Sequence, residues 1–91
     1  MLSVSWKIDA QDDLAEIIDT IEQRNESAAS ELHATIVQAA ENLPFMPYLF
    51  RRGRVVGTRE YVVHPNTILV YRVGKENIEI LRVLHSRQQY P

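Results

Sequence analysis

The sequence has 91 residues, which is enough for one domain over residues 1–91 with a core of modest size. It contains no cysteine, which excludes disulfides, thiolate nucleophiles and cysteine-based metal sites, and no apolar stretch approaches the roughly 18 residues of a membrane span. The net charge of -2 conceals an asymmetry, because residues 1–50 hold nine acidic and two basic side chains while residues 51–91 hold eight basic and three acidic ones.

The first half of the chain predicts a strand and two helices. Polar and apolar residues alternate over residues 3–8, which is typical of a half-buried strand. Asp9 is predicted to be the N-cap of an amphipathic helix over residues 10–24, where apolar residues recur at helical spacing. Asn25 breaks this helix and can cap a second one over residues 27–43. Two helices with so short a connection are expected to pack as an antiparallel hairpin.

The second half predicts a loop and then three strands. Residues 44–58 carry two prolines, two glycines, three arginines and three aromatic side chains, and they are predicted to form a loop. Its aromatic residues either pack under the helical hairpin or form a groove for a partner: Phe45, Tyr48 and Phe50. Strand-like runs over residues 59–63, 67–73 and 78–84 are separated by tight turns, so these strands are expected to be antiparallel.

These elements predict an α+β fold of order β-α-α-β-β-β, with the N-terminal helical hairpin packed on an antiparallel sheet. The order and the residues resemble the RelE/ParE superfamily of toxins from type II toxin–antitoxin systems, closest to the ParE branch. Three passages carry the resemblance: Trp6 followed by Ala10-Gln11-Asp12-Asp13-Leu14, then Gly57-Thr58-Arg59-Glu60 with Ile68-Leu69-Val70-Tyr71-Arg72-Val73, and finally Val83-Leu84-His85-Ser86-Arg87-Gln88.

The resemblance implies a cytoplasmic growth-arrest toxin of a plasmid-stabilisation module that is neutralised by a cognate antitoxin and needs no cofactor, metal or membrane. ParE-type members poison DNA gyrase, whereas RelE-type members are endonucleases that cut messenger RNA on the ribosome. A third reading is a relative that binds its antitoxin and has lost toxicity. An exposed sheet edge and a helix–sheet groove would suit strand addition and helix docking by the antitoxin.

The candidate site residues differ between the two active readings. A metal-free nuclease needs a base, an acid and cations around one phosphate, and the residues that match such a site are His85, Arg59, Arg87 and Tyr90. Under the ParE reading, the candidates for target contact are Arg59, Arg82, His85 and Arg87. Tyr61 and Ile68 stand where RelE-type members carry further basic residues, and a pI of about 5.9 is low for a protein that docks on ribosomal RNA. Both observations favour the gyrase reading.

Each candidate also has a purely structural interpretation. His85 at a strand end is more often a surface or hydrogen-bonded histidine than a catalyst. Arg59 beside Glu60 is compatible with an ion pair that carries no function, worth about 0–1 kcal/mol if exposed. Trp6 is expected in the core, while His33 and His64 are expected on the surface and in a turn.

Overall fold

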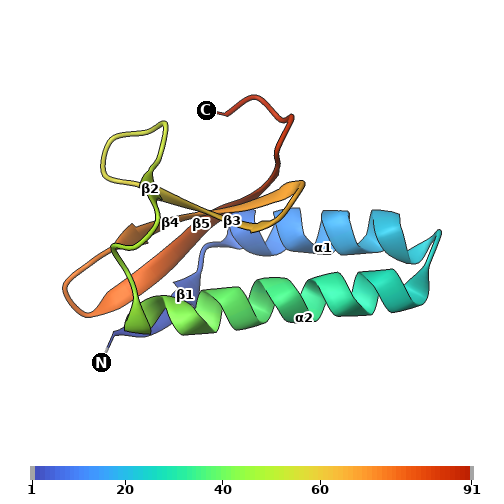
Figure 1. Cartoon of the computed structure of the whole chain (residues 1–91), viewed down its shortest axis with the longest axis horizontal. Coiled ribbons are helices and arrows are strands. Elements are labelled where there is room, and N and C mark those ends of the chain that lie inside the picture. Colours follow the sequence, from blue (N-terminus) through green and yellow to red (C-terminus); the bar gives the residue numbers. More distant parts are fainter. Residues whose placement is uncertain (1, 91) are drawn as a thin grey trace.

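The structure, a computed structural model, describes residues 2–90 and contains two helices and five strands (Figure 1). The order along the chain is β1 (Ser3–Trp6), α1 (Ile8–Glu22), α2 (Glu26–Asn42), a short 3-10 helix (Leu43–Phe45), β2 (Arg51–Arg52), β3 (Arg59–His64), β4 (Thr67–Val73) and β5 (Asn77–His85). This order confirms the predicted α+β class, and the three long strands lie within two residues of their predicted bounds.

The strands form one sheet in the order β1-β5-β4-β3-β2. Strands β3, β4 and β5 pair antiparallel as predicted, and β2 also pairs antiparallel with β3, whereas β1 lies parallel to β5, so the sheet is mixed. The two-residue strand β2 lies inside the segment predicted to be a loop. A β-bulge interrupts the pairing of β4 with β5 between Val70 and Tyr71. The bulge changes which side chains of β5 face the helices.

The helices form the predicted hairpin, but the first one begins earlier than expected. Asp9 is not its N-cap: Lys7 holds this position in an extended conformation without a side-chain cap, and Asp9 lies in the first turn. The prediction for Asn25 is confirmed, since its Oδ1 accepts a hydrogen bond of 3.1 Å from the backbone N–H of Ala28. Within residues 2–90, no helix combines the length and the apolar character needed to cross a bilayer.

The sheet separates the molecule into two unequal sides (Figure 1). One face is covered by the hairpin, and its core contains the apolar side chains Ala10, Leu32, Ile36, Ala39, Ala40, Leu43, Leu69, Tyr71, Ile78, Ile80 and Val83. Trp6, which was expected in the core, is half-buried and packs against its margin. The opposite face carries a smaller cluster of Ile68, Val70, Leu81 and Leu84. The C-terminal tail passes over that second face, and Tyr90 packs on the cluster.

Candidate functional site

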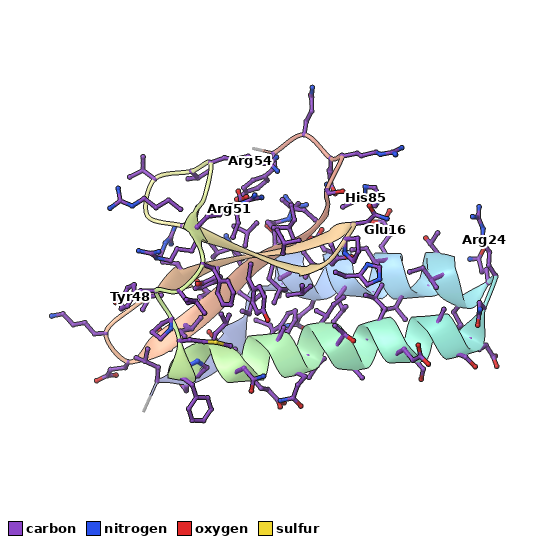
Figure 2. All side chains as sticks on the ribbon, viewed as in Figure 1. Glu16, Arg24, Tyr48, Arg51, Arg54 and His85 are labelled. Atoms are coloured by element: carbon purple, nitrogen blue, oxygen red, sulfur yellow. The ribbon has the colours of Figure 1, made fainter. Side chains whose placement is uncertain are left out.

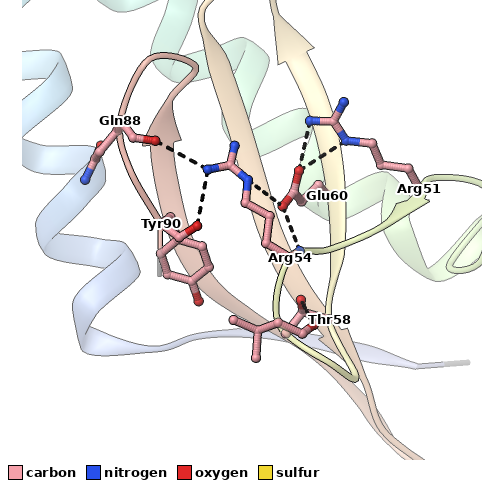
Figure 3. A network of polar contacts seen from close by, with 7 residues as sticks. Arg51, Arg54, Thr58, Glu60, Gln88 and Tyr90 are labelled. Atoms are coloured by element: carbon pink, nitrogen blue, oxygen red, sulfur yellow. Dashed lines mark hydrogen bonds and ion pairs between the residues drawn. The ribbon is translucent and has the colours of Figure 1, made fainter.

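A buried carboxylate organises the arginines of the β2–β3 region (Figure 3). Glu60 is 3% exposed, and its Oε1 accepts hydrogen bonds of 3.1 and 2.8 Å from Nε and Nη2 of Arg51. Its Oε2 accepts a hydrogen bond of 3.2 Å from the backbone N–H of Arg54 and lies 3.4 Å from Arg54 Nε. Glu60 therefore pairs with Arg51 and Arg54, and not with the neighbouring Arg59, because adjacent strand residues point to opposite faces.

Arg54 extends this network to the C-terminal tail. Its Nη1 donates hydrogen bonds of 3.4 Å to the carbonyl oxygens of Gln88 and Tyr90. The Tyr90 ring in turn lies 5.6 Å below the guanidinium of Arg82. The tail is thus held on the uncovered face of the sheet by a chain of contacts that begins at Glu60.

Arg82 joins β5 to the first helix. Its Nε and Nη2 donate to the Asp13 carboxylate at 2.6 and 3.0 Å, and Asp13 Oδ2 also accepts a 2.9 Å hydrogen bond from the backbone N–H of Val83. The hydrogen bonds that Arg82 donates to Asp13 raise the pKa of Arg82 above its already high value, so the guanidinium stays charged. Since β1 ends at Trp6, opposite Ile80, Asp13 provides the acceptor that a neighbouring strand would otherwise supply.

Arg59 lies at the start of β3 and is held by backbone oxygens. Its Nη1 donates to the carbonyl of Phe50 at 2.8 Å and to that of Tyr48 at 3.4 Å, and its guanidinium lies 5.1 Å from the Tyr48 ring centroid. The nearby Tyr71 hydroxyl donates to the Pro47 carbonyl at 2.8 Å. Burial raises the pKa of Tyr71 to about 12, an effect that the positive charge of Arg59 partly opposes.

His85 and Arg87 lie at the far end of β5, and both are exposed. The backbone N–H of Arg87 donates to His85 Nδ1 at 3.2 Å, and Gln88 Oε1 accepts from the backbone N–H of His85 at 3.3 Å. His85 also borders a surface cavity of about 370 Å³ between β5 and α1, opposite Glu16 (Figure 2). The hydrogen bond to Nδ1 holds the imidazole at the rim of this cavity, which is lined by apolar side chains such as Ile17 and Ile21 together with acidic ones.

The sheet register places the sequence-derived candidates at three different positions. Arg59 pairs with Tyr71 and His85 pairs with Thr67, so four residues of β4, or about 13 Å, separate their positions along the strand. Both face the helical side, because directly opposed residues share a face. Arg82 and Tyr90 lie together on the opposite face. Only two pairs, His85 with Arg87 and Arg82 with Tyr90, are therefore brought together.

Sequence reasoning missed the structural roles of Asp13, Glu60 and Arg54. The concentration of arginines just before Glu60 was a usable signal, because a single acidic residue among several cations attracts them if it is buried. Asp13 offered no such signal, since its partner is 69 residues away in the sequence. The aromatic residues of the predicted loop do not all behave alike. Phe50 packs against the core and stacks on Tyr61 with 3.7 Å between the ring centroids, whereas Phe45 and Tyr48 are 71% and 66% exposed. Among residues 2–90, no three His, Asp or Glu side chains gather as metal ligands do.

Known proteins resemble this chain over nearly its whole length. The protein described as "Putative toxin Y4kP" from Sinorhizobium fredii is 35% identical over 89 residues, which are 97% of this chain and 92% of that protein. The solved structure of a chromosomal ParDE toxin–antitoxin system from P. aeruginosa superposes with a TM-score of 0.84 at 25% identity, covering 93% of this chain and 96% of that one. A YoeB/ParE toxin from Agrobacterium tumefaciens shares the fold, with a TM-score of 0.65 at 15% identity over 98% of this chain and 100% of that one.

The family match agrees with these individual comparisons. The profile of the family described as ParE toxin of type II toxin-antitoxin system, parDE, matches residues 4–90. This span includes both helices, all but the first residue of the sheet and the tail as far as Tyr90. The chain therefore belongs to the ParE toxin family of type II toxin–antitoxin systems.

Proposed function

We propose that this toxin arrests bacterial growth by inhibiting DNA gyrase in the cytoplasm, and that a cognate antitoxin holds it inactive. The observation that carries the choice of target is the separation of Arg59 from His85 by about 13 Å along β4. Cleavage of RNA without a metal requires a base, cations and an acid around one phosphate, each within hydrogen-bond reach. The separation of these two side chains favours a toxin that acts by binding a protein.

The placement of Arg82 and Tyr90 supports the same choice. The Arg82 guanidinium is paired with Asp13 at 2.6 Å, so much of its charge is already neutralised within the protein. Tyr90 packs on the apolar cluster of the sheet face that the helices leave uncovered. A net charge of -2 is also poorly suited to the ribosome, because affinity for RNA depends strongly on neutralising phosphates.

The antitoxin has a suitable surface on the helical side of the molecule. A groove of about 460 Å³ runs beside the hairpin, with Trp6, Leu14, Ile18 and Val37 among its apolar walls. An amphipathic helix of a partner can place its apolar face in such a groove. The likeness to a solved ParDE system supports an antitoxin as that partner.

The messenger-RNA endonuclease stays as the second candidate because of the pair formed by His85 and Arg87. Both side chains are exposed, and the backbone N–H of Arg87 donates to His85 Nδ1, so a titratable imidazole and a cation lie on one short segment, as acid–base chemistry on RNA would require. The two proposals differ in what the histidine does. His85→Ala is expected to leave growth arrest largely intact if gyrase is the target, and to abolish it if RNA is cut.

The test is inducible expression in bacteria, with DNA synthesis and protein synthesis measured separately during the first minutes. We expect DNA synthesis to stop first and the cells to filament, and purified gyrase then to be inhibited by the purified toxin. If protein synthesis stops first, the nuclease replaces gyrase inhibition as the function. If growth continues, the chain is a relative that binds its antitoxin without toxicity. Co-expression of the antitoxin should restore growth in either toxic case.

A further inference from the structure

A cleft of about 410 Å³ opens between the segment before β2 and the loop that joins β2 to β3. Tyr48 lies on one side, the loop lies on the other, and Val73 of β4 contributes to the lining. We call it the arginine cleft, with the defining residues Tyr48, Arg52, Val55, Val56, Arg59 and Val73. It is a separate surface from the hairpin groove assigned above to the antitoxin, because the two share no lining residue.

Hydrogen bonds within the loop that forms one wall give it a fixed shape. The backbone N–H of Gly53 donates to the carbonyl of Thr58 at 2.8 Å, and the Thr58 hydroxyl donates to the carbonyl of Val55 at 2.6 Å. Gly53 leaves no room for a Cβ against the Thr58 side chain, and Gly57 has a φ of +85°, which favours glycine. Internal hydrogen bonds and two glycines therefore hold Val56 at the tip, where it is 97% exposed.

The cleft carries positive charge that the toxin does not neutralise. Among the described residues, the ion pairs of this region belong to Arg51 and Arg54, both with Glu60, while Arg52 and Arg59 form none. No acidic residue lines the cleft. Arg59 is also held in place by its hydrogen bonds to the Phe50 and Tyr48 carbonyls. An anionic group that enters the cleft would meet two positive charges, one of them already positioned.

Exposed apolar side chains beside these arginines give the cleft the composition of a protein-binding surface. Tyr48 and Val56 are 66% and 97% exposed and line the same cleft as Arg52 and Arg59. Interfaces between proteins are enriched in tyrosine and arginine, and exposed apolar groups in a small soluble protein often mark such interfaces. A valine at the tip of a rigid loop loses little conformational freedom on binding.

We infer that the arginine cleft is the surface with which the toxin contacts its protein target. The occupant is a protein segment that places a carboxylate between Arg52 and Arg59 and an apolar side chain against Tyr48 and Val56. This inference rests on the proposed function, since it requires gyrase, a protein, as the target. A nucleic acid fits less well, because two unpaired cations beside an apolar wall offer few phosphate contacts.

The test measures the binding of purified full-length toxin to purified gyrase, with two cleft variants and two matched controls. Val56→Asp and Arg52→Glu place negative charge in the cleft. Val62→Asp alters another exposed valine, on β3, and Arg24→Glu makes the same charge reversal at the turn between the helices. The cleft variants should weaken binding roughly tenfold or more, and the controls by less than about twofold. Circular dichroism and thermal unfolding would verify that all four variants are folded.

The other outcomes separate the inference from the proposed function. Gyrase binding that is unchanged in both cleft variants would overturn the cleft and leave gyrase as the target. Equal losses in Arg52→Glu and Arg24→Glu would also overturn it, because general electrostatic attraction would then explain the binding. If wild-type toxin does not bind gyrase, the proposed function fails and the inference falls with it. Binding of duplex DNA or RNA that is lost in the cleft variants would replace the protein partner by a nucleic acid.

Discussion

The two faces of the sheet are stabilised in different ways. The face under the helical hairpin is closed by a continuous apolar core that includes Ile36, Leu69 and Tyr71, each fully buried. The opposite face has a small apolar cluster bordered by charged groups, among them Glu60, which pairs with Arg51 and Arg54, and Arg82, which pairs with Asp13. Packing therefore secures the first face, and a few directed hydrogen bonds secure the second. This division leaves the second face free to carry exposed side chains such as Arg72 and Val62.

The largest expected effect comes from the packed face. Ile36 of α2 is fully buried between the helices and the sheet, so Ile36→Ala should lower the free energy of unfolding by about 2–5 kcal/mol. Urea denaturation measures this difference. Val62→Ala is the matched control, because Val62 is 47% exposed and should lose less than about 1 kcal/mol. Equal losses in the two variants would mean that the helical side is not the stabilising face.

The second effect concerns the connection between the first helix and β5. Asp13→Asn removes the charge that pairs with Arg82 and weakens the acceptor for the backbone N–H of Val83, which should cost about 1.5–3 kcal/mol. The control is Asp12→Asn, on the neighbouring exposed residue. Thermal unfolding of the two variants gives the comparison. An equal change in both would show that helix charge, and not the contact with β5, is responsible.

The same contrast explains how much of the fold could be predicted from the sequence. The strand over 67–73 and the two helices follow from local periodicity, because their apolar residues repeat at the spacing of one buried face. The parallel pairing of β1 with β5 joins Ser3 to Asn77, and nothing in either segment specifies the other. The predicted start of the first helix was wrong for a related reason. The backbone N–H of Lys7 still donates to the Ile80 carbonyl at 2.9 Å, so the helix begins directly after this contact.

The candidate site was harder to predict from the sequence than the fold. The sequence identified Arg59 and His85 as polar residues on strands, but only the register of β3 and β5 on β4 places them at opposite ends. The arginine cleft depends on β2, which is two residues long and has no periodicity to detect. Glycines at 53 and 57 indicated turns, whereas the exposure of Val56 follows from how those turns combine.

A third effect is smaller and depends on pH. Tyr71→Phe removes the hydrogen bond to the Pro47 carbonyl, at a cost of about 1 kcal/mol near neutral pH. Burial raises the pKa of Tyr71 from 10.0 to about 12, so the neutral phenol is favoured in the folded protein. Its contribution is complete below the unfolded pKa of 10.0 and is lost as the pH rises through about 12.

Urea denaturation at several alkaline pH values tests this dependence. Between pH 10 and 12, the wild type should lose stability more steeply than Tyr71→Phe, because its unfolded state ionises at position 71 first. Tyr48→Phe is the control, since Tyr48 is 66% exposed and should follow the wild type. Parallel curves for the wild type and Tyr71→Phe would mean that the buried phenol does not contribute to the alkaline transition.

The smallest effect on overall stability is expected where the uncovered face holds the tail. Arg54→Gln removes the ion pair with Glu60 and the two 3.4 Å hydrogen bonds to the Gln88 and Tyr90 carbonyls. Because the Arg54 side chain is 36% exposed, its loss should lower the free energy of unfolding by less than about 1 kcal/mol. The tail itself should respond more strongly, since these contacts attach it to the loop that joins β2 to β3.

Amide hydrogen exchange can separate the local effect from the global one. The backbone N–H of Gln88 donates to the His85 carbonyl at 2.9 Å, and its exchange should accelerate in Arg54→Gln while the core amides of β4 exchange as in the wild type. Arg72→Gln is the matched control, because it removes an exposed arginine from β4 that has no hydrogen bond to the tail among residues 2–90. If the core amides accelerate as much as Gln88, the tail and core open together, and directed hydrogen bonds on the second face contribute to global stability as packing does on the first.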